Sequence, residues 1–352
     1  MTGNLISQLG GRNTLEKALF NNLIWIKKSF AHNNNLGSSG WSNLLGKFSA
    51  PYPETTGYLI PTLINSSQYL NDSSYLLLAE KQVDFFSSIQ NSDGSFYQSI
   101  NNKAPIVFDT SQILLGLCAI YQYQINSKLL EQINLCLDWL LSLIDKKGHF
   151  TNYNFTKQSC PAYYSRVFWA MLLAQKLLGL KANPLILSGV NSILQQRQSN
   201  NSFLQWGFDN ESYVLTHNIV YTLRGLYETA LLSDNKELLS VVENCINSII
   251  SKILADNKLY GAYNHQWEPD RSMVCSVGNA QLAYLMLTID RSKYSVAIKK
   301  VLQPLLLKQS NTVVNKGAVP SSLPIWGRYQ RWRYTNWTQK FFCDALLSLL
   351  KE

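Results

Sequence analysis

The sequence predicts an all-α protein: a closed, double-layered barrel of six helical hairpins, forming a single domain over residues 1–352. Three observations support this fold class. Helix-length apolar segments recur at intervals of about 50 to 60 residues and fall into two interleaved series. One series is apolar on nearly all sides, whereas the other is amphipathic. Short and long connections alternate between them.

The apolar series is predicted to form the inner layer, because a helix that is hydrophobic all round is buried among other helices. Residues 111–117 are an example. These segments begin near Glu54, Asp109, Tyr163, Thr216, Ser276 and Asn336. The amphipathic series, exemplified by residues 290–298, is predicted to form the outer layer. Its segments begin near Asn13, Ser73, Ser127, Asn183, Ser233 and Asp290.

Local signals support individual helices of the outer layer. A capping box, Asn13 to Glu16, is predicted to open the first, and Asn183 before a proline to open the fourth. Ser233 and Asp290 are expected caps of later outer helices. The third shows a 3.6-residue stripe of Leu129, Leu130, Ile133, Leu137 and Leu140. Strand signals are sparse. An open helical solenoid is the alternative to a closed ring.

The long connections all lead from an outer to an inner helix, so they gather at one end of the barrel. They span residues 31–53, 91–108, 146–162, 198–215, 256–275 and 309–335. That end also carries the N-termini of the inner helices, with their free N–H groups. Because loops on a rigid scaffold carry function, we expect the site there.

Composition narrows the possible function classes. Hydrophobic residues make up 46% and charged residues 15% of the chain, which excludes a disordered protein. The net charge is +9, but no nucleic-acid-binding signature accompanies it, so no nucleic-acid partner is expected. The six cysteines form no CxxC pair and the four histidines are scattered. We therefore expect buried thiols, no metal and no cofactor.

The sequence carries no clear targeting segment. No unbroken apolar run reaches the roughly 18 residues of a membrane span. The first thirty residues lack the order of a signal peptide. We expect a cytoplasmic protein without an integral membrane segment.

Several segments at the loop ends and inner-helix starts are distinctive. They are Tyr52–Tyr58, Phe108–Gln112, Thr216–Thr222, Gly278–Ala283 and Leu323–Tyr329, with Asn336, Trp337 and Lys340–Phe342. Together they resemble the six-hairpin (α/α)6 toroid proteins encoded among bacterial surface-polysaccharide genes, those for capsule, O-antigen, lipopolysaccharide or exopolysaccharide. The resemblance covers nearly the whole chain. It implies a carbohydrate-active protein: a glycoside hydrolase, a polysaccharide lyase or a sugar epimerase.

A second, weaker resemblance concerns residues 90–96, which look like the QxxDGSF turn of terpene cyclases and protein prenyltransferases. In those families the turn is structural, and the Asp-rich acid motifs of terpene cyclases are absent here. We interpret it as a turn in which Gly94 adopts a positive φ and Asp93 bonds the backbone.

Glu54 and Asp109 are the best candidates for an acid/base pair, because cleaving a glycosidic bond commonly uses two carboxyl groups. They open consecutive inner helices, so they could instead simply cap them. His217 opens the fourth inner helix and is the candidate base for lyase or epimerase chemistry. Weaker candidates in later loops are Asp209, Glu211, Glu268 and Asp270.

Aromatic, basic and amide side chains near the same end are candidates for binding substrate. Sugar rings stack on aromatic faces, and Trp267 and Trp326 are the aromatic residues favoured for the cleft. Arginine forks bind carboxylates, so a late basic cluster favours an acidic glycan. The predicted substrate-binding residues are Tyr58, Arg166, Trp267, Asn279, Gln281, Trp326, Arg328, Asn336, Trp337 and Lys340.

The favoured function is an enzyme acting on an acidic polysaccharide or precursor oligosaccharide. One alternative is a non-catalytic glycan-binding or scaffold protein that contacts other polysaccharide-assembly proteins. Another is a terpenoid cyclase or prenyltransferase-like enzyme. Paired carboxyl groups in the cavity would support the first, aromatic residues without an acid pair the second, and a deep apolar cavity the third.

Overall fold

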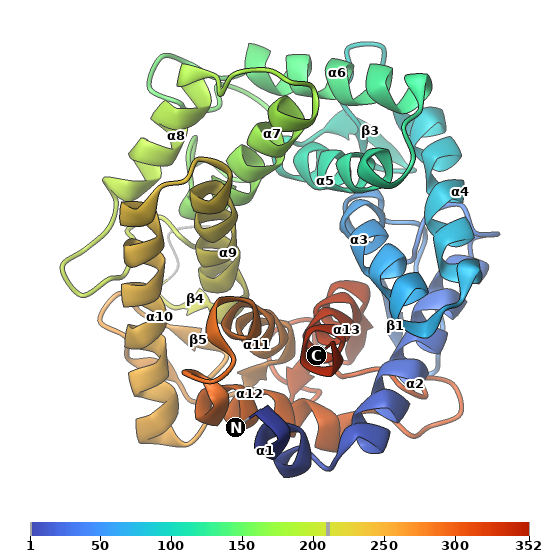
Figure 1. Ribbon diagram of the computed structural model, residues 1–352, viewed down its shortest axis with the longest axis vertical. Coiled ribbons are helices and arrows are strands. Elements are labelled where there is room, and N and C mark those ends of the chain that lie inside the picture. The colour runs from blue at the N-terminus through green and yellow to red at the C-terminus, as the bar shows by residue number, and fades with distance from the viewer. Residues whose placement is uncertain (1, 209–211, 352) are drawn as a thin grey trace.

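The computed structural model describes residues 2–208 and 212–351, which form a closed (α/α)6 toroid (Figure 1). The inner layer consists of α3 (Pro53–Leu70), α5 (Val107–Tyr123), α7 (Ser165–Leu177), α9 (Thr216–Leu232), α11 (Ser276–Asp290) and α13 (Asn336–Leu350). The outer layer consists of α2 (Arg12–Ala31), α4 (Ser73–Ile89), α6 (Ser127–Ser142), α8 (Pro184–Leu194), α10 (Lys236–Asp256) and α12 (Ser295–Lys308). A short helix, α1 (Thr2–Gln8), precedes them. Each inner helix contacts the next and α13 contacts α3, so the solenoid alternative is wrong.

Burial separates the two layers as the hydrophobic pattern predicts. In α5, 13 of 17 residues are buried, because α3, α6 and α7 surround it. In α6, 7 of 16 residues are buried, and they form the stripe that faces the core. The inner helices therefore enclose the axis of the barrel, and the outer helices shield them from solvent.

Two glycines let α3 and α5 approach closely at the point where the N-terminal half of α3 meets the middle of α5. A Cβ atom on Gly57 would lie 2.5 Å from the Cα of Ile113, and one on Gly116 would lie 2.3 Å from the carbonyl oxygen of Gly57. Any side chain at either position would push the two backbones apart. This contact brings the first turns of the two helices, which carry Glu54 and Asp109, next to each other.

The two ends of the chain close the ring. The last inner helix, α13, packs on the first outer helix, α2, and the buried amide of Asn22 donates to Gln339 Oε1 at 2.8 Å. Near the loop end, β1 (Trp41–Asn43) pairs antiparallel with β9 (Arg333–Thr335). The sixth hairpin is thus formed by elements from opposite ends of the sequence.

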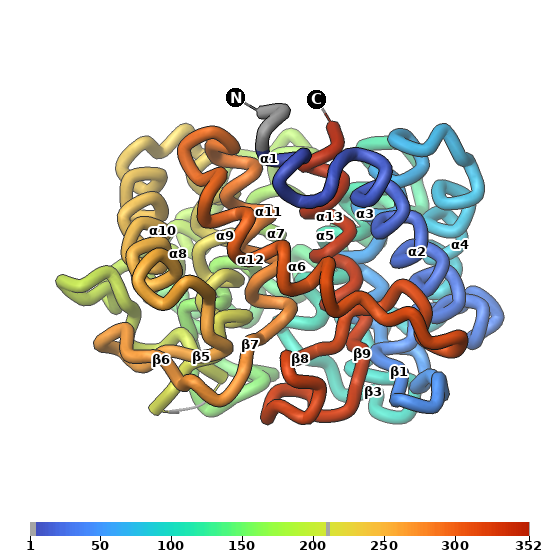
Figure 2. The backbone as a smooth tube through the Cα atoms, turned by 90° about the horizontal axis from the view of Figure 1, so that it is seen from below, coloured from blue at the N-terminus to red at the C-terminus, as the bar shows by residue number. Residues whose placement is uncertain are grey.

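The long loops gather at one end of the toroid, as predicted (Figure 2). They carry the remaining strands: β2 (Tyr97–Ser99), β3 (Asn102–Pro105), β4 (Val214–Leu215), β5 (Ala262–Tyr263), β6 (Pro269–Asp270), β7 (Val274–Cys275) and β8 (Ser322–Leu323). The QxxDGSF segment is a structural turn. Gly94 has φ +94°, a Cβ there would lie 2.2 Å from the Leu135 carbonyl oxygen, and Asp93 accepts from the Ser95 backbone at 3.0 Å.

Three expected caps are wrong. Helix α2 starts one residue before Asn13, with Gly11 at its N-cap, so the predicted capping box does not form. Ser233 ends α9 and Asp290 is the last residue of α11. The side chain of Asn235 caps α10, whereas α12 has no side-chain cap. Asn183 caps α8 as predicted, accepting from the Leu185 N–H.

Within the described chain, α10 is the one helix whose length and averaged hydropathy match those of a membrane span. In the fold it lies in the outer layer, where Val242, Ile246 and Ile249 are buried and the helix contacts α9. All six cysteines are buried and free. No cluster of three metal-ligating side chains occurs among the residues that the structure describes.

Candidate active site

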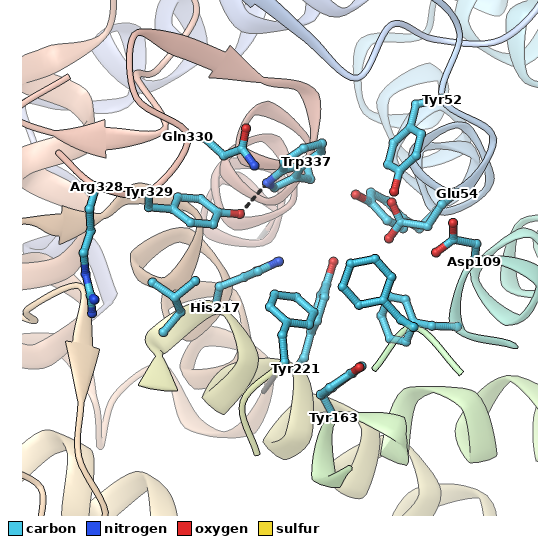
Figure 3. A pocket seen from close by; sticks show the side chains of 15 residues that line it. Tyr52, Glu54, Asp109, Tyr163, His217, Tyr221, Arg328, Tyr329, Gln330 and Trp337 are labelled. Carbon is cyan, nitrogen blue, oxygen red and sulfur yellow. Dashed lines mark hydrogen bonds between the residues drawn. The ribbon is translucent and has the colours of Figure 1, made fainter. Parts of the chain in front are cut away.

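A cavity of about 380 Å³ lies at the loop-bearing end of the barrel axis; we call it the upper cavity (Figure 3). Its walls come from the N-terminal turns of inner helices and from the loops before them. The lining residues are Tyr52, Glu54, Tyr58, Phe108, Asp109, Phe155, Tyr163, Phe208, Leu215, His217, Tyr221, Arg328, Tyr329, Gln330 and Trp337. The cavity is therefore mostly aromatic, with two carboxyl groups and an imidazole.

Glu54 and Asp109 lie side by side on one wall, as Figure 3 shows, and both are buried. Neither carboxyl residue is the N-cap of its helix. The N-cap residues are Tyr52 and Ile106, whose side chains make no capping hydrogen bond. Thr55 donates to Glu54 Oε2 at 3.3 Å, whereas Asp109 Oδ2 is buried without a hydrogen-bond partner among the described residues. Stability alone does not account for this arrangement, because an unsatisfied buried carboxyl costs free energy.

Burial raises the pKa of both carboxyl groups. The pKa of Glu54 lies well above its ordinary value, first because of desolvation and second because Asp109 is close. Desolvation raises the pKa of Asp109 to about 7. Because two adjacent carboxyl groups resist ionising together, the pair holds at least one proton near neutral pH.

His217 projects into the same cavity from the first turn of α9. Burial lowers its pKa to about 3, so the imidazole is neutral at physiological pH. Its Nδ1 lies 3.3 Å from Gln281 Oε1, and its ring centre lies 4.3 Å from that of Tyr221. Figure 3 places Tyr221 between His217 and the carboxyl pair. A neutral histidine here can exchange hydrogen bonds with a ligand but is a weak proton acceptor.

The loop before α13 supplies the wall opposite the carboxyl pair. Trp337 donates from Nε1 to the Tyr329 hydroxyl at 2.7 Å, which fixes both rings in the wall. Arg328 is half exposed at the rim and forms an ion pair with Asp270 at 2.9 Å. A ligand carboxylate would therefore share this guanidinium with Asp270.

The structure brings together Glu54, Tyr58, Asp109, His217, Arg328 and Trp337 in one cavity, with Gln281 behind His217. Two further predicted residues lie deeper along the axis. Arg166 is buried and donates to Gln112 at 2.8 Å, and Lys340 forms a buried ion pair with Asp344. Neither lines the upper cavity.

Four predicted binding residues lie elsewhere. Trp267 is buried in the core of its own loop, where its Nε1 donates to the Asn200 carbonyl at 2.9 Å. Asn279 faces α12 and donates to the Val301 carbonyl, and Asn336 holds Ser29 and Ser39 together. Trp326 is 57% exposed outside the cavity, against Trp332.

The weaker carboxylate candidates do not join the pair. Glu268 accepts from Asn264 within a loop turn, and Asp270 pairs with Arg328 at the rim. Asp209 and Glu211 lie outside the described residues.

Nine of the lining residues are not among the candidate site residues named from the sequence: Tyr52, Phe108, Phe155, Tyr163, Phe208, Leu215, Tyr221, Tyr329 and Gln330. Tyr221 could have been predicted, because it stands four positions after His217 and so lies on the same face of α9. Phe155, Phe208 and Gln330 come from irregular loops, whose paths no periodic pattern describes.

Comparison with known proteins identifies the fold. No protein-family model matches this chain, and no curated protein sequence matches it. Among solved structures, it is similar to an unsaturated glucuronyl hydrolase from Streptococcus agalactiae, with 14% identity, a TM-score of 0.72, and 100% of this chain and 96% of that one covered. It is also similar to the corresponding hydrolase from Bacillus sp. GL1, with 13% identity, a TM-score of 0.73 and coverages of 95% and 96%.

An α-amylase from Clostridium perfringens is a third similar structure, with 14% identity, a TM-score of 0.68 and coverages of 94% and 97%. At these identities the likeness concerns the fold alone. The chain thus has the complete six-hairpin toroid architecture of its structural neighbours, among which are the unsaturated glucuronyl hydrolases.

Proposed function

We propose that this protein is a glycoside hydrolase that removes a sugar from the end of a short acidic oligosaccharide. The observation that carries the proposal is the buried, adjacent pair of Glu54 and Asp109 in an aromatic cavity. Burial raises the pKa values of both carboxyl groups, so the pair can supply one acid and one base near neutral pH.

In the proposed reaction, Glu54 donates its proton to the glycosidic oxygen as the C–O bond breaks, and ionised Asp109 beside it stabilises the positive charge that develops on the sugar. Water then adds to the anomeric carbon and gives a proton to Asp109, so atoms and charges balance. The base must be ionised, so activity should rise with pH through about 7, the pKa of Asp109, and fall when Glu54 loses its proton. A pH profile of kcat/KM tests this order of ionisation.

Hydrolysis is favoured over lyase or epimerase chemistry because of His217. Those reactions need a base that removes a proton from carbon, and an imidazole whose pKa is about 3 is too weak for that task. A scaffold protein has no use for two buried carboxyl groups that destabilise each other. A terpenoid cyclase would use Asp-rich motifs, and the sequence contains none.

Two observations support an acidic oligosaccharide as the substrate. Arg328 stands at the rim, and aromatic rings suited to stacking on sugars line the walls. The structural neighbours include an unsaturated glucuronyl hydrolase variant bound to dGlcA-Glc-Rha-Glc. The ring of Phe341 packs against two lining residues, with its centre 5.9 Å from that of Tyr58 and 6.0 Å from that of Tyr221. Because these rings close the inner end of the cavity, we propose that only a chain end enters.

The resemblance to proteins of surface-polysaccharide gene clusters suggests the biological setting. We propose that the protein acts in the cytoplasm on a precursor of capsule, O-antigen, lipopolysaccharide or exopolysaccharide, in contact with assembly proteins. Trimming a precursor before export would suit a cytoplasmic hydrolase, whereas a finished surface polymer would be out of its reach.

The decisive experiment compares wild type with Glu54→Gln and Asp109→Asn on a panel of acidic oligosaccharides, including unsaturated uronyl disaccharides. We expect each amide variant to lose about 10²- to 10⁴-fold in kcat/KM. The matched control is Asp84→Asn, because the Asp84 side chain is 77% exposed on α4. Turnover unchanged in both variants would remove the pair from the mechanism, and binding without turnover in wild type would favour the scaffold alternative.

A further inference from the structure

A second cavity, of about 200 Å³, lies on the barrel axis, farther than the first from the end that carries the long loops; we call it the lower cavity. Its lining residues come from all six inner helices, and most of them lie farther along these helices than the residues of the first turns, so the cavity lies deeper in the barrel than the first. Tyr58 borders both cavities, and its ring packs against Phe341 at 5.9 Å. The proposed hydrolysis does not use this space.

Three cationic side chains line the lower cavity: Arg166 from α7, Arg224 from α9 and Lys340 from α13. Two carboxylates accompany them, since Lys340 pairs with Asp344 and Arg224 pairs with Glu228. Asp344 also accepts a hydrogen bond from Thr62 at 2.7 Å, so it has little capacity left to accept further hydrogen bonds. The cluster therefore has one more positive than negative charge, in a space enclosed by helices.

Arg224 has unused hydrogen-bond donors here. Its Nη2 bonds Glu228 and lies 3.4 Å from the Tyr284 hydroxyl, but Nε and Nη1 are buried without a hydrogen-bond partner among the described residues. Arginine N–H groups make strong, charge-assisted hydrogen bonds with carboxylate oxygens. Leaving two of them unpaired in a buried position costs free energy, which a bound anion would recover.

Arg166 supplies the excess positive charge of the cluster. Its Nε donates to the neutral Gln112, and its guanidinium lies over the rings of Tyr221 at 4.5 Å and Trp169 at 5.2 Å. No carboxylate lies within ion-pair distance of it in the described ranges 2–208 and 212–351. Burial, together with the neighbouring Arg224, lowers its pKa. An anion between the two arginines would reduce their repulsion.

We propose that the lower cavity is a binding site for a small monoanionic carboxylate, no larger than a monosaccharide. The single excess positive charge matches one carboxylate, and a dianion such as phosphate would meet Asp344 and Glu228 as additional repulsion. Trp169, Tyr284 and Phe341 provide apolar faces for the remainder of the ligand. The hydrolysis proposed for the upper cavity does not use this site, although the charge of Arg166 opposes the rise in the pKa of Glu54.

Isothermal titration calorimetry with D-glucuronate as the probe tests the proposal, with glucose and inorganic phosphate as comparison ligands. We expect glucuronate to bind wild type at millimolar or tighter Kd, at least tenfold more tightly than either comparison ligand. Arg224→Gln should weaken binding at least tenfold. Ala119→Phe should do the same by filling the cavity from α5 while leaving every charge in place. It keeps the test valid if Arg224→Gln does not fold.

The control variant is Lys128→Gln, which removes a surface cation whose side chain is 53% exposed. It should bind glucuronate as wild type does. The proposal is overturned if wild type shows no binding at about 20 mM glucuronate, well above the millimolar Kd of a weak site. It is equally overturned if glucose binds as tightly as glucuronate, or if Ala119→Phe keeps the affinity of wild type.

Discussion

The Asp109→Asn variant should gain stability relative to wild type as the pH rises, although the substitution removes a candidate catalytic group. The reason is that the folded protein raises the pKa of this carboxyl to about 7 from its ordinary 3.8. A carboxyl with a raised pKa contributes its stability fully below pH 3.8 and loses it as the pH rises through 7. The asparagine variant cannot ionise, so it escapes that loss.

The magnitude follows from the two pKa values. Ionising Asp109 in the folded state rather than in the unfolded chain costs about 1.4 kcal/mol for each pH unit between 3.8 and about 7, or about 4 kcal/mol in all. Entry of water into the cavity would reduce this figure, so we expect a difference of about 2 to 4 kcal/mol. The cost of burying the new amide shifts the whole curve but does not change its slope with pH.

Urea unfolding of wild type and Asp109→Asn at pH values from 4 to 8 provides the measurement. The free energy of unfolding of the variant, minus that of wild type, should increase steadily up to pH 7 and then level off. Asp84→Asn, on the surface of α4, should run parallel to wild type throughout. Parallel curves for Asp109→Asn as well would mean that its carboxyl ionises normally, and the acid/base assignment would fall with it.

Three further predictions follow from other parts of the structure. His217→Gln should gain up to about 5 kcal/mol of stability relative to wild type as the pH falls from 6.5 to about 3, as measured by urea unfolding. The reason is that folding lowers the pKa of His217, so protonation of the histidine destabilises wild type only. Trp267→Ala should lower the free energy of unfolding by about 3 to 5 kcal/mol without changing KM, since the ring packs in a loop core. Gly57→Ala should reduce both Tm and kcat, because the added methyl would meet the Ile113 backbone; an unchanged kcat would show that the spacing of α3 and α5 does not matter.

The layered fold could be predicted from the sequence because burial leaves a periodic signal. A helix such as α5, surrounded by others, must be apolar on all faces, and a helix such as α6 needs only one apolar stripe. Alternating loop lengths then fix which end of the barrel carries the site. Caps were less predictable: Asn183 caps its helix, but Asn13 does not, because Gly11 starts α2 earlier. Several side chains can compete to start a helix within two or three residues.

The cavity residues were predictable only where a helix fixed their direction. Glu54, Asp109 and His217 all lie in the first turns of inner helices, so the ring directs them to one mouth. Trp267 and Trp326 lie on irregular loops, where composition does not reveal whether a ring faces the cavity, the loop core or solvent. The structure shows one in the core and one in solvent.

The proximity of the carboxyl pair depends on residues that carry no chemistry themselves. Two acids that open neighbouring helices need not approach each other, because ordinary side chains between helices keep their axes 8 to 10 Å apart. Gly57 and Gly116 remove that spacing on α3 and α5, and the repulsion between the acids is then borne by the packing of the whole inner ring. Separating Glu54 from Asp109 therefore requires separating two core helices, so the toroid can hold in place the unfavourable charge arrangement that the proposed hydrolysis needs.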